Sequence, residues 1–191
     1  MTLETLDRTV CWTPIGGAGF EHLQLRAEEG GYVARSTVLG IDEETPFRLQ
    51  YKIKTDAAWR TRKLWVRTAT PVGESALALR SDGHGNWRSE DGTEMPELRD
   101  CIDVDITATP FTNTLPINRL RLAPGQSAEL RMVYVTTPNL EVSVSTQRYS
   151  RRGDSEIFFE SPAHDFTALL PIDDAGLVLD YPQLFARVYP R

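Results

Sequence analysis

The stretch that decides the fold is residues 100–122, DCIDVDITATPFTNTLPINRLRL. Successive side chains of a strand point to opposite faces of a sheet, so alternating polarity predicts a β-strand. After this alternation, Pro110 ends the strand in a corner rich in Thr, Asn and Pro, and a further apolar segment predicts a second strand. We therefore expect the central strand and bend of a curved sheet here. The alternating residues are Ile102, Val104, Ile106 and Ala108 on one face, and Asp103, Asp105, Thr107 and Thr109 on the other.

The same period of two recurs along the rest of the chain. It is clearest in residues 47–54, FRLQYKIK, whereas no stretch of ten or more residues keeps a helical apolar period. Only the tail, residues 182–188, is compatible with one or two helical turns. The pattern predicts an all-β, antiparallel fold of about a dozen or more strands with little helix, in a single domain spanning residues 1–191. A sheet of that many strands curls or splits, so we expect a barrel, a sandwich or a roll.

The composition of the chain disfavours several functional classes of protein. The 191 residues include 21 Lys and Arg against 27 Asp and Glu, a formal net charge of −6. This balance disfavours general nucleic-acid binding, which needs a basic surface to neutralise phosphates. Cys11 and Cys101 are too few for a disulfide framework and are expected to be buried thiols. With no secretion signal and no window near the roughly 18 apolar residues of a membrane span, we expect a cytoplasmic protein without integral membrane association.

Asp103 and Asp105 form the D-x-D pattern with which glycosyltransferases hold a divalent metal. Residues i and i+2 of a strand share a face, so both carboxylates could converge on one cation. Those enzymes are built from alternating β/α units, which this chain lacks, and its three histidines and two cysteines have no zinc-ligand spacing. The sequence therefore favours a polar strand face, with no metal and no cofactor.

Basic residues are concentrated between positions 48 and 67, where only Asp56 opposes them. If the two strands of this segment form a hairpin, they present a cationic sheet face that suits an anionic headgroup or a phosphate. The alternative is a solvated face that keeps sheet edges apart and is neutralised elsewhere in the protein. The basic residues are Arg48, Lys52, Lys54, Arg60, Arg62, Lys63 and Arg67.

Two histidines are candidate catalytic groups. His84 lies in a Gly-His-Gly turn, and His164 precedes Asp165. A His beside an Asp suggests a general base, but no recognisable nucleophile motif accompanies it. We therefore expect no catalytic residues.

Aromatic residues are frequent in the expected strands. They either line an apolar cavity or fill the core, and a large roll or half-barrel has more interior than its side chains fill. These residues are Trp12, Trp59, Trp65, Trp87, Tyr134, Tyr149, Phe158, Phe159 and Phe166.

Five segments together resemble a bacterial family described as "putative glycolipid-binding" proteins: GYVARSTVLG (31–40), FRLQYKIKTDAAWRTRKLWV (47–66), LRSDGHGNW (79–87), DCIDVDITATPFTNTLPINRL (100–120) and FTALLPIDDAGLVLDYPQLFARV (166–188). The similarity covers roughly residues 10–189, and DGHGNW and DCIDVDITATPFTNTLPI are its most distinctive parts. The resemblance implies a spiral β-roll, an open half-barrel related in shape to carriers of lipid acyl chains. It identifies no particular residues as catalytic.

The features together predict a non-catalytic protein that binds a glycolipid or another amphipathic small molecule. In this hypothesis aromatic side chains contact apolar chains, arginines meet an anionic or sugar headgroup, and the two carboxylates of the D-x-D pattern accept hydrogen bonds from sugar hydroxyls. The expected ligand-binding residues are Arg60, Arg62, Trp65, Arg67, Trp87, Asp103, Asp105, Tyr134 and Phe166.

Two alternatives remain open. The first is an enzyme that acts on a sugar- or lipid-derived metabolite through Asp103 and Asp105 with His84 or His164. It requires these groups to meet in one concave pocket. The second is a structural or interaction module, such as a homodimer formed through an exposed sheet face. It requires a filled core and a large apolar patch.

Overall fold

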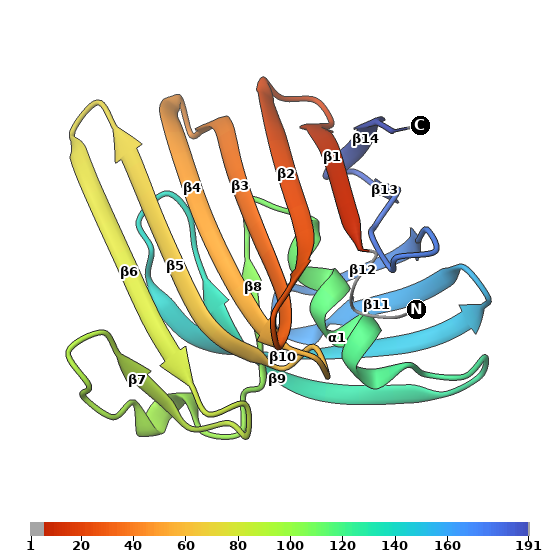
Figure 1. Cartoon of the computed structure of the whole chain (residues 1–191). Coiled ribbons are helices and arrows are strands. Elements are labelled where there is room, and N and C mark those ends of the chain that lie inside the picture. The colour runs from red at the N-terminus through yellow and green to blue at the C-terminus, as the bar shows by residue number, and fades with distance from the viewer. Residues whose placement is uncertain (1–5, 191) are drawn as a thin grey trace.

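A computed structural model describes residues 6–190 of the chain (Figure 1). Within these residues the backbone is mostly β, which confirms the predicted all-β class with little helix. One seven-residue helix, α1 (Thr114–Leu120), and three short 3-10 helices, η2 (Pro96–Leu98), η3 (Phe111–Asn113) and η4 (Pro162–His164), interrupt the strands. The strands are β1 (Asp7–Pro14), β2 (Gly19–Glu28), β3 (Gly31–Asp42), β4 (Thr45–Asp56), β5 (Thr61–Thr70), β6 (Gly73–Ser81), β7 (Trp87–Ser89), β8 (Asp103–Ile106), β9 (Ser127–Val135), β10 (Val142–Gly153), β11 (Glu156–Ser161), β12 (Phe166–Pro171), β13 (Asp180–Tyr181) and β14 (Phe185–Tyr189).

The strands form two sheets. The larger has nine strands in the order β13-β14-β1-β2-β3-β4-β5-β6-β7, and the smaller has five in the order β12-β11-β10-β9-β8. Neighbouring strands in both sheets pair antiparallel except β8 and β9, which run parallel. Figure 1 shows the smaller sheet curling beneath the larger one. This arrangement confirms the predicted roll with a half-barrel.

One face of the larger sheet is buried and the other is exposed to solvent, as the alternation of apolar and polar residues predicts. On β4, Leu49, Tyr51 and Ile53 are almost fully buried, whereas Arg48 and Gln50 are exposed. The β4–β5 hairpin predicted from the basic segment is present, and Lys54 stands opposite Lys63 across it. The buried face of this sheet is one wall of the interior.

The prediction for residues 100–122 was wrong in two respects. Its strand, β8, is an edge strand of the smaller sheet and not a central one, and the segment after the corner is helical, in η3 and α1. Residues 111–117 are all buried, so the segment has no wet face and therefore no amphipathic period to reveal a helix. Pro116 lies in the first turn of α1, where a helix tolerates proline because its missing N–H is not needed.

The expected helical turns in the tail were also wrong. Residues 185–189 form strand β14, which pairs with β1 at the other end of the chain. Tertiary pairing overrides a weak local preference here.

The segment after β8 connects the two sheets. Phe111 of η3 is fully buried, and its ring stacks on Tyr51 of β4 with centroids 6.2 Å apart. Leu115 of α1 is fully buried in the same core cluster as Val104 and Val133 of the smaller sheet. Cys11 and Cys101 are buried free thiols, as predicted. Across residues 6–190, the helices are all too short or too polar to cross a membrane.

Candidate functional site

Two adjoining pockets open between the sheets. The first, called the aromatic pocket, has a volume of about 300 Å³ and is bordered by β8, β9, β10, β11 and the segment 181–185. The second, called the apolar pocket, has a volume of about 360 Å³ and is bordered by β1, β2, β3 and the same segment. Thr107, Leu184 and Phe185 line both pockets. The two pockets therefore share a wall.

Aromatic rings form much of the first pocket. Phe159 and Phe166 lie 6.2 Å apart between centroids, and each lies about as close to Tyr181, at 6.1 and 5.9 Å. Phe185 continues the row at 6.4 Å from Tyr181. The rings come from β11, β12, β13 and β14, so both sheets contribute to this wall.

Asp105 supplies a carboxylate to the aromatic pocket. Its Oδ1 accepts a hydrogen bond from Thr112 Oγ1 at 2.9 Å, and its Oδ2 accepts one from Gln147 Nε2 at 2.6 Å. Burial raises the pKa of Asp105, and these two donors oppose the shift. Asn113 also lines the pocket and lies within 3.0 Å of the Tyr149 hydroxyl. The pocket thus combines flat apolar rings with fixed polar groups, as small-molecule sites commonly do.

His164 stands at the edge of the same pocket. Its Nδ1 lies 2.9 Å from Ser161 Oγ, and its ring lies over Tyr134 with centroids 5.2 Å apart. Ser161 is 5% exposed. A histidine, a hydroxyl and the Asp105 carboxylate therefore share one concavity.

The apolar pocket has a different lining. Trp12, Val38, Phe47 and Ala108 give it a mainly apolar interior. Glu21 of β2 is a buried acid in its wall. Exposed apolar side chains, which usually occur singly on a protein surface, gather around this pocket: Ile15, Phe20, Leu39, Ile41 and Leu184.

Among the residues expected to bind a ligand, the fold brings three together. Asp105, Tyr134 and Phe166 all line the aromatic pocket. They come from β8, β9 and β12, and β8 and β12 are the two edges of the smaller sheet. The curl of that sheet is what brings them to one concavity.

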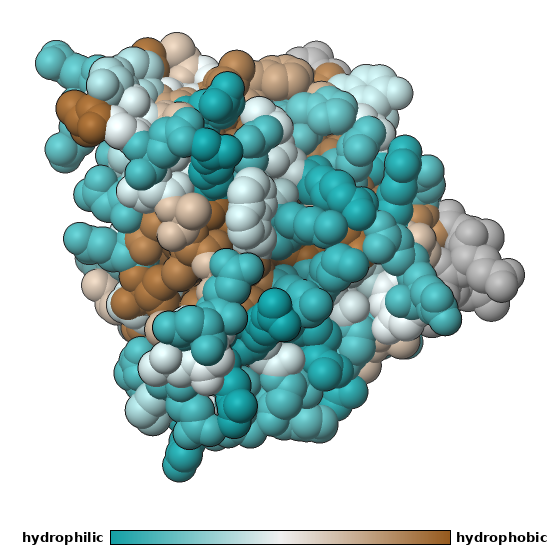
Figure 2. Space-filling model, turned by 60° about the vertical axis from the view of Figure 1, so that its left-hand side comes forward, coloured by the Kyte–Doolittle hydropathy of each residue, from teal (hydrophilic) through white to brown (hydrophobic). Residues whose placement is uncertain are grey.

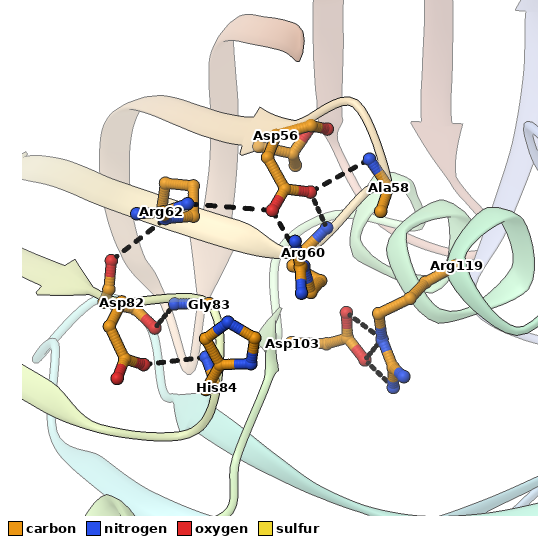
Figure 3. A network of polar contacts seen from close by, with 11 residues as sticks. Asp56, Ala58, Arg60, Arg62, Asp82, Gly83, His84, Asp103 and Arg119 are labelled. Carbon is orange, nitrogen blue, oxygen red and sulfur yellow. Dashed lines mark hydrogen bonds and ion pairs between the residues drawn. The ribbon is translucent and has the colours of Figure 1, made fainter. Parts of the chain in front are cut away.

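Asp103 lies elsewhere, in a buried ion pair (Figure 3). Both its oxygens accept hydrogen bonds from Arg119 Nε, at 3.1 and 2.9 Å, and Oδ2 also accepts one from Nη2 at 2.6 Å. The Asp103 side chain is 1% exposed. The pair joins α1 to β8, so the two carboxylates of the D-x-D pattern have different environments.

The three arginines also lie apart from both pockets. Arg60 Nε donates to Asp56 Oδ2 at 2.8 Å, and Arg62 Nε donates to the carbonyl of Ser81 at 3.2 Å. Figure 3 shows these groups beside the turn that carries His84. Arg67 is exposed on β5 and paired with Glu74. Contact of any of these arginines with a ligand stays a prediction.

The two tryptophans on the predicted list differ in exposure. Trp65 is 40% exposed on the outer face of β5. Trp87 is 2% exposed, and its Nε1 donates to the carbonyl of Cys101 at 2.6 Å. Trp87 also borders a hollow of about 540 Å³ that exposed Arg80 and Arg99 flank. Because the charged groups of that hollow are solvated, it is a weaker candidate than the paired pockets.

Metal binding has no candidate cluster in the region 6–190: no three His, Cys, Asp or Glu side chains gather there in a way that could hold an ion.

Sequence reasoning missed several residues of the two pockets. Gln147 and Tyr181 carry no local signal, because their roles depend on strand pairing. Glu21 had one available signal. It has the same parity as Leu23 and Leu25 on a predicted strand, and an acid on the apolar face of a strand is unusual.

Comparisons with known proteins agree with this architecture. The family described as "Putative glycolipid-binding" matches residues 9–187. The chain belongs to this family. It is also similar to a solved structure, the crystal structure of a DUF1089 family protein from Pseudomonas aeruginosa at 1.80 Å resolution. The two share 38% sequence identity with a TM-score of 0.84, over 91% of this chain and 94% of that one. A search of curated proteins found no match.

Proposed function

We propose that this protein binds a glycolipid or a related amphipathic small molecule in the two adjoining pockets, without catalysis. The observation that carries the proposal is the shared wall: Thr107, Leu184 and Phe185 separate a pocket with polar and aromatic groups from one with a mainly apolar lining. A molecule with a polar end and an alkyl chain matches this division. Membership of the "Putative glycolipid-binding" family supports a binding function.

The polar end belongs in the aromatic pocket. Asp105 and Gln147 provide hydrogen-bonding groups there, and Tyr134 and Phe166 provide flat apolar faces. Aromatic rings with a few convergent polar groups are suited to a sugar, which has both hydroxyls and apolar C–H surface. Asp103 and the three arginines lie outside both pockets, so their contact with a ligand stays a separate prediction.

The alkyl chain belongs in the apolar pocket. Burial of each CH₂ group contributes about 0.8 kcal/mol, so even a short chain segment stabilises the complex. Each pocket lies near the lower end of the roughly 300–1,000 Å³ typical of small-molecule sites. One pocket alone is therefore too small for a whole glycolipid, and the exposed apolar side chains around the second give the rest of the chain a contact surface.

Native mass spectrometry with lipid extraction tests the proposal. The protein is purified from its native host as wild type, as Ala108→Phe and as Ala76→Phe. Ala108 lines the apolar pocket, whereas Ala76 is exposed on β6 outside both pockets. We expect an amphipathic molecule to remain bound to the wild type and to Ala76→Phe, and to be depleted about tenfold in Ala108→Phe, because the added ring fills the pocket.

A titration with dodecyl glucoside provides the second measurement. Wild type and Ala76→Phe should bind it alike, and thermal unfolding should show that Ala108→Phe is folded. Absence of any co-purifying lipid, together with equal dodecyl glucoside affinity in all three proteins, would falsify the proposal.

One observation favours a second candidate function, an enzyme acting on a sugar- or lipid-derived metabolite. His164, Ser161 and Asp105 line one pocket, with the His164 ring nitrogen 2.9 Å from the Ser161 hydroxyl. His84 and Asp103 lie outside that pocket. Turnover of a glycoside or ester that disappears in His164→Gln, with binding unchanged, would establish this activity.

We propose a cytoplasmic protein that does not bind nucleic acid, for which the two free thiols and the negative net charge are the support. We propose a homodimer as a further partner. Figure 2 shows an apolar band between hydrophilic side chains on the face that it presents, which offers a contact surface. Size-exclusion chromatography with light scattering measures the oligomeric state.

A further inference from the structure

Glu21 is held by only one of its two carboxyl oxygens. The side chain is 2% exposed in the wall of the apolar pocket. Its Oε1 accepts hydrogen bonds from Ser36 Oγ at 2.7 Å, Tyr51 Oη at 2.7 Å and Thr109 Oγ1 at 2.9 Å. Among residues 6–190, in contrast, no donor reaches Oε2. A buried polar atom without a partner is rare in proteins and costs free energy.

We propose that Glu21 Oε2 recognises a hydroxyl group that the amphipathic ligand carries on or beside its alkyl chain. This inference rests on the proposed binding function and specifies it, since it names the polar group that the apolar pocket selects. A ligand that brings a hydroxyl to Oε2 relieves the unpaired oxygen, and a bare alkyl chain does not. The pocket would therefore distinguish between chains that fill it equally well.

The protonation of Glu21 explains why a hydroxyl is the suitable group. Burial raises the pKa of Glu21 to about 7, against the opposing effect of its three hydrogen-bond donors. Near neutral pH both the acid and the carboxylate are therefore populated. The three donors occupy Oε1, so in the acid form the proton resides on Oε2, which then donates a hydrogen bond. A hydroxyl both donates and accepts and pairs with either form, whereas an ether oxygen only accepts.

The effects of the other titratable groups near Glu21 can be distinguished from the effect of Glu21 itself. Tyr51 on β4 and Cys11 on β1 face it, and burial raises the pKa of both, so they stay protonated through neutral pH. Asp42 lines the apolar pocket from the end of β3, and His164 lies in the adjoining pocket. A pH effect that persists when Glu21 is replaced belongs to these other groups.

The test measures how tightly decanol and decyl methyl ether each bind to three proteins. These are the wild type, Glu21→Gln and the exposed control Glu141→Gln. Affinities are measured at about pH 5.5 and about pH 8.5, on either side of the Glu21 pKa. At the higher pH the wild type should prefer decanol by about fivefold or more, because only the hydroxyl can donate to the carboxylate. At the lower pH this preference should shrink, because Oε2–H donates to the ether as well.

At either pH, Glu21→Gln should bind the two compounds as the wild type does at low pH. Its amide oxygen can keep the three donors at Oε1, and its NH₂ group then replaces Oε2 as a permanent donor. The preference for decanol should therefore be small at both pH values, and Glu141→Gln should match the wild type. The pH dependence of the wild type is a second measurement that needs no variant.

The outcomes separate this inference from the function on which it rests. A decanol preference that is the same at both pH values and in Glu21→Gln would overturn the role of Glu21 and leave alkyl-chain binding intact. Failure of the wild type to bind either compound would overturn the proposed function as well.

Discussion

At the scale of single residues, Glu21 places a buried, titratable carboxyl group in the wall of the apolar pocket. The carboxyl lies on the buried face of β2, and three hydroxyl donors do not offset the cost of burying its charge. In the unfolded chain the same group titrates near its ordinary pKa of 4.5. The folded protein therefore binds a proton that the unfolded chain releases across the window between 4.5 and about 7.

This linkage predicts how stability changes with pH. Because the folded state binds more protons in that window, the Glu21 contribution should fall as pH rises through it and be lost above about 7. Glu21→Gln has no such titration. Its free energy of unfolding relative to wild type should therefore increase by on the order of 3 kcal/mol from about pH 4.5 to about pH 8. Urea unfolding at several pH values measures this difference, and parallel curves for the two proteins would contradict it.

At the scale of elements, the turn between β2 and β3 carries two adjacent glycines whose surroundings differ. Gly30 has a φ of +82° and open space where a Cβ would lie. A Cβ on Gly31 would lie 2.0 Å from the carbonyl oxygen of Thr55 on β4. Two adjacent glycines therefore serve different purposes: the first permits a left-handed backbone, and the second permits close contact between strands.

Alanine at each position should reveal this difference. Gly30→Ala should cost about 1 kcal/mol, the cost of placing an L-residue in the left-handed region. Gly31→Ala should cost roughly 3 kcal/mol or more, because the β3–β4 ladder must open to admit the methyl group. Thermal and denaturant unfolding of the two variants provide the comparison. Equal losses would show that the close approach at Gly31 relaxes without cost.

At the scale of the whole molecule, the roll presents one end of its interior to solvent through the apolar pocket. The exposed apolar residues there belong to separate hairpins and to the C-terminal segment, and they surround the opening together. In the proposed function they form the first contact of an alkyl chain on its way into the interior. Val72, which is 94% exposed at the β5–β6 turn, does not line the pocket and provides a comparison.

A charge at this opening should impede ligand uptake. Ile41→Asp should weaken dodecyl glucoside binding by roughly tenfold, since a solvated carboxylate replaces an apolar contact worth about 1.5 kcal/mol. Val72→Asp should bind as the wild type does. Stopped-flow and equilibrium titration of both variants measure the effect. If both variants lose affinity equally, the apolar opening has no specific role.

Much of the fold was predictable because the patterns that identify strands and hairpins involve residues close together in the sequence. The alternation of residues 47–54 identifies β4, and the glycines at 30 and 31 mark the turn into β3. The helix after β8 was not predictable in this way, because residues 111–117 are buried on every side and show no period. The partner of Asp103 was equally hidden, since Arg119 lies on that unforeseen helix.

The candidate site depended on the tertiary structure. Asp105, Tyr134 and Phe166 were all expected to contact a ligand, but no spacing in the chain connects them. The sequence by itself determined the all-β class, the β4–β5 hairpin and the residue types available for binding, since each follows from neighbouring residues. Only the tertiary structure decided that Asp105 and Phe166, from opposite edges of a curled sheet, share a pocket. The reason is that closure of the roll depends on pairing between distant strands, which no local pattern records.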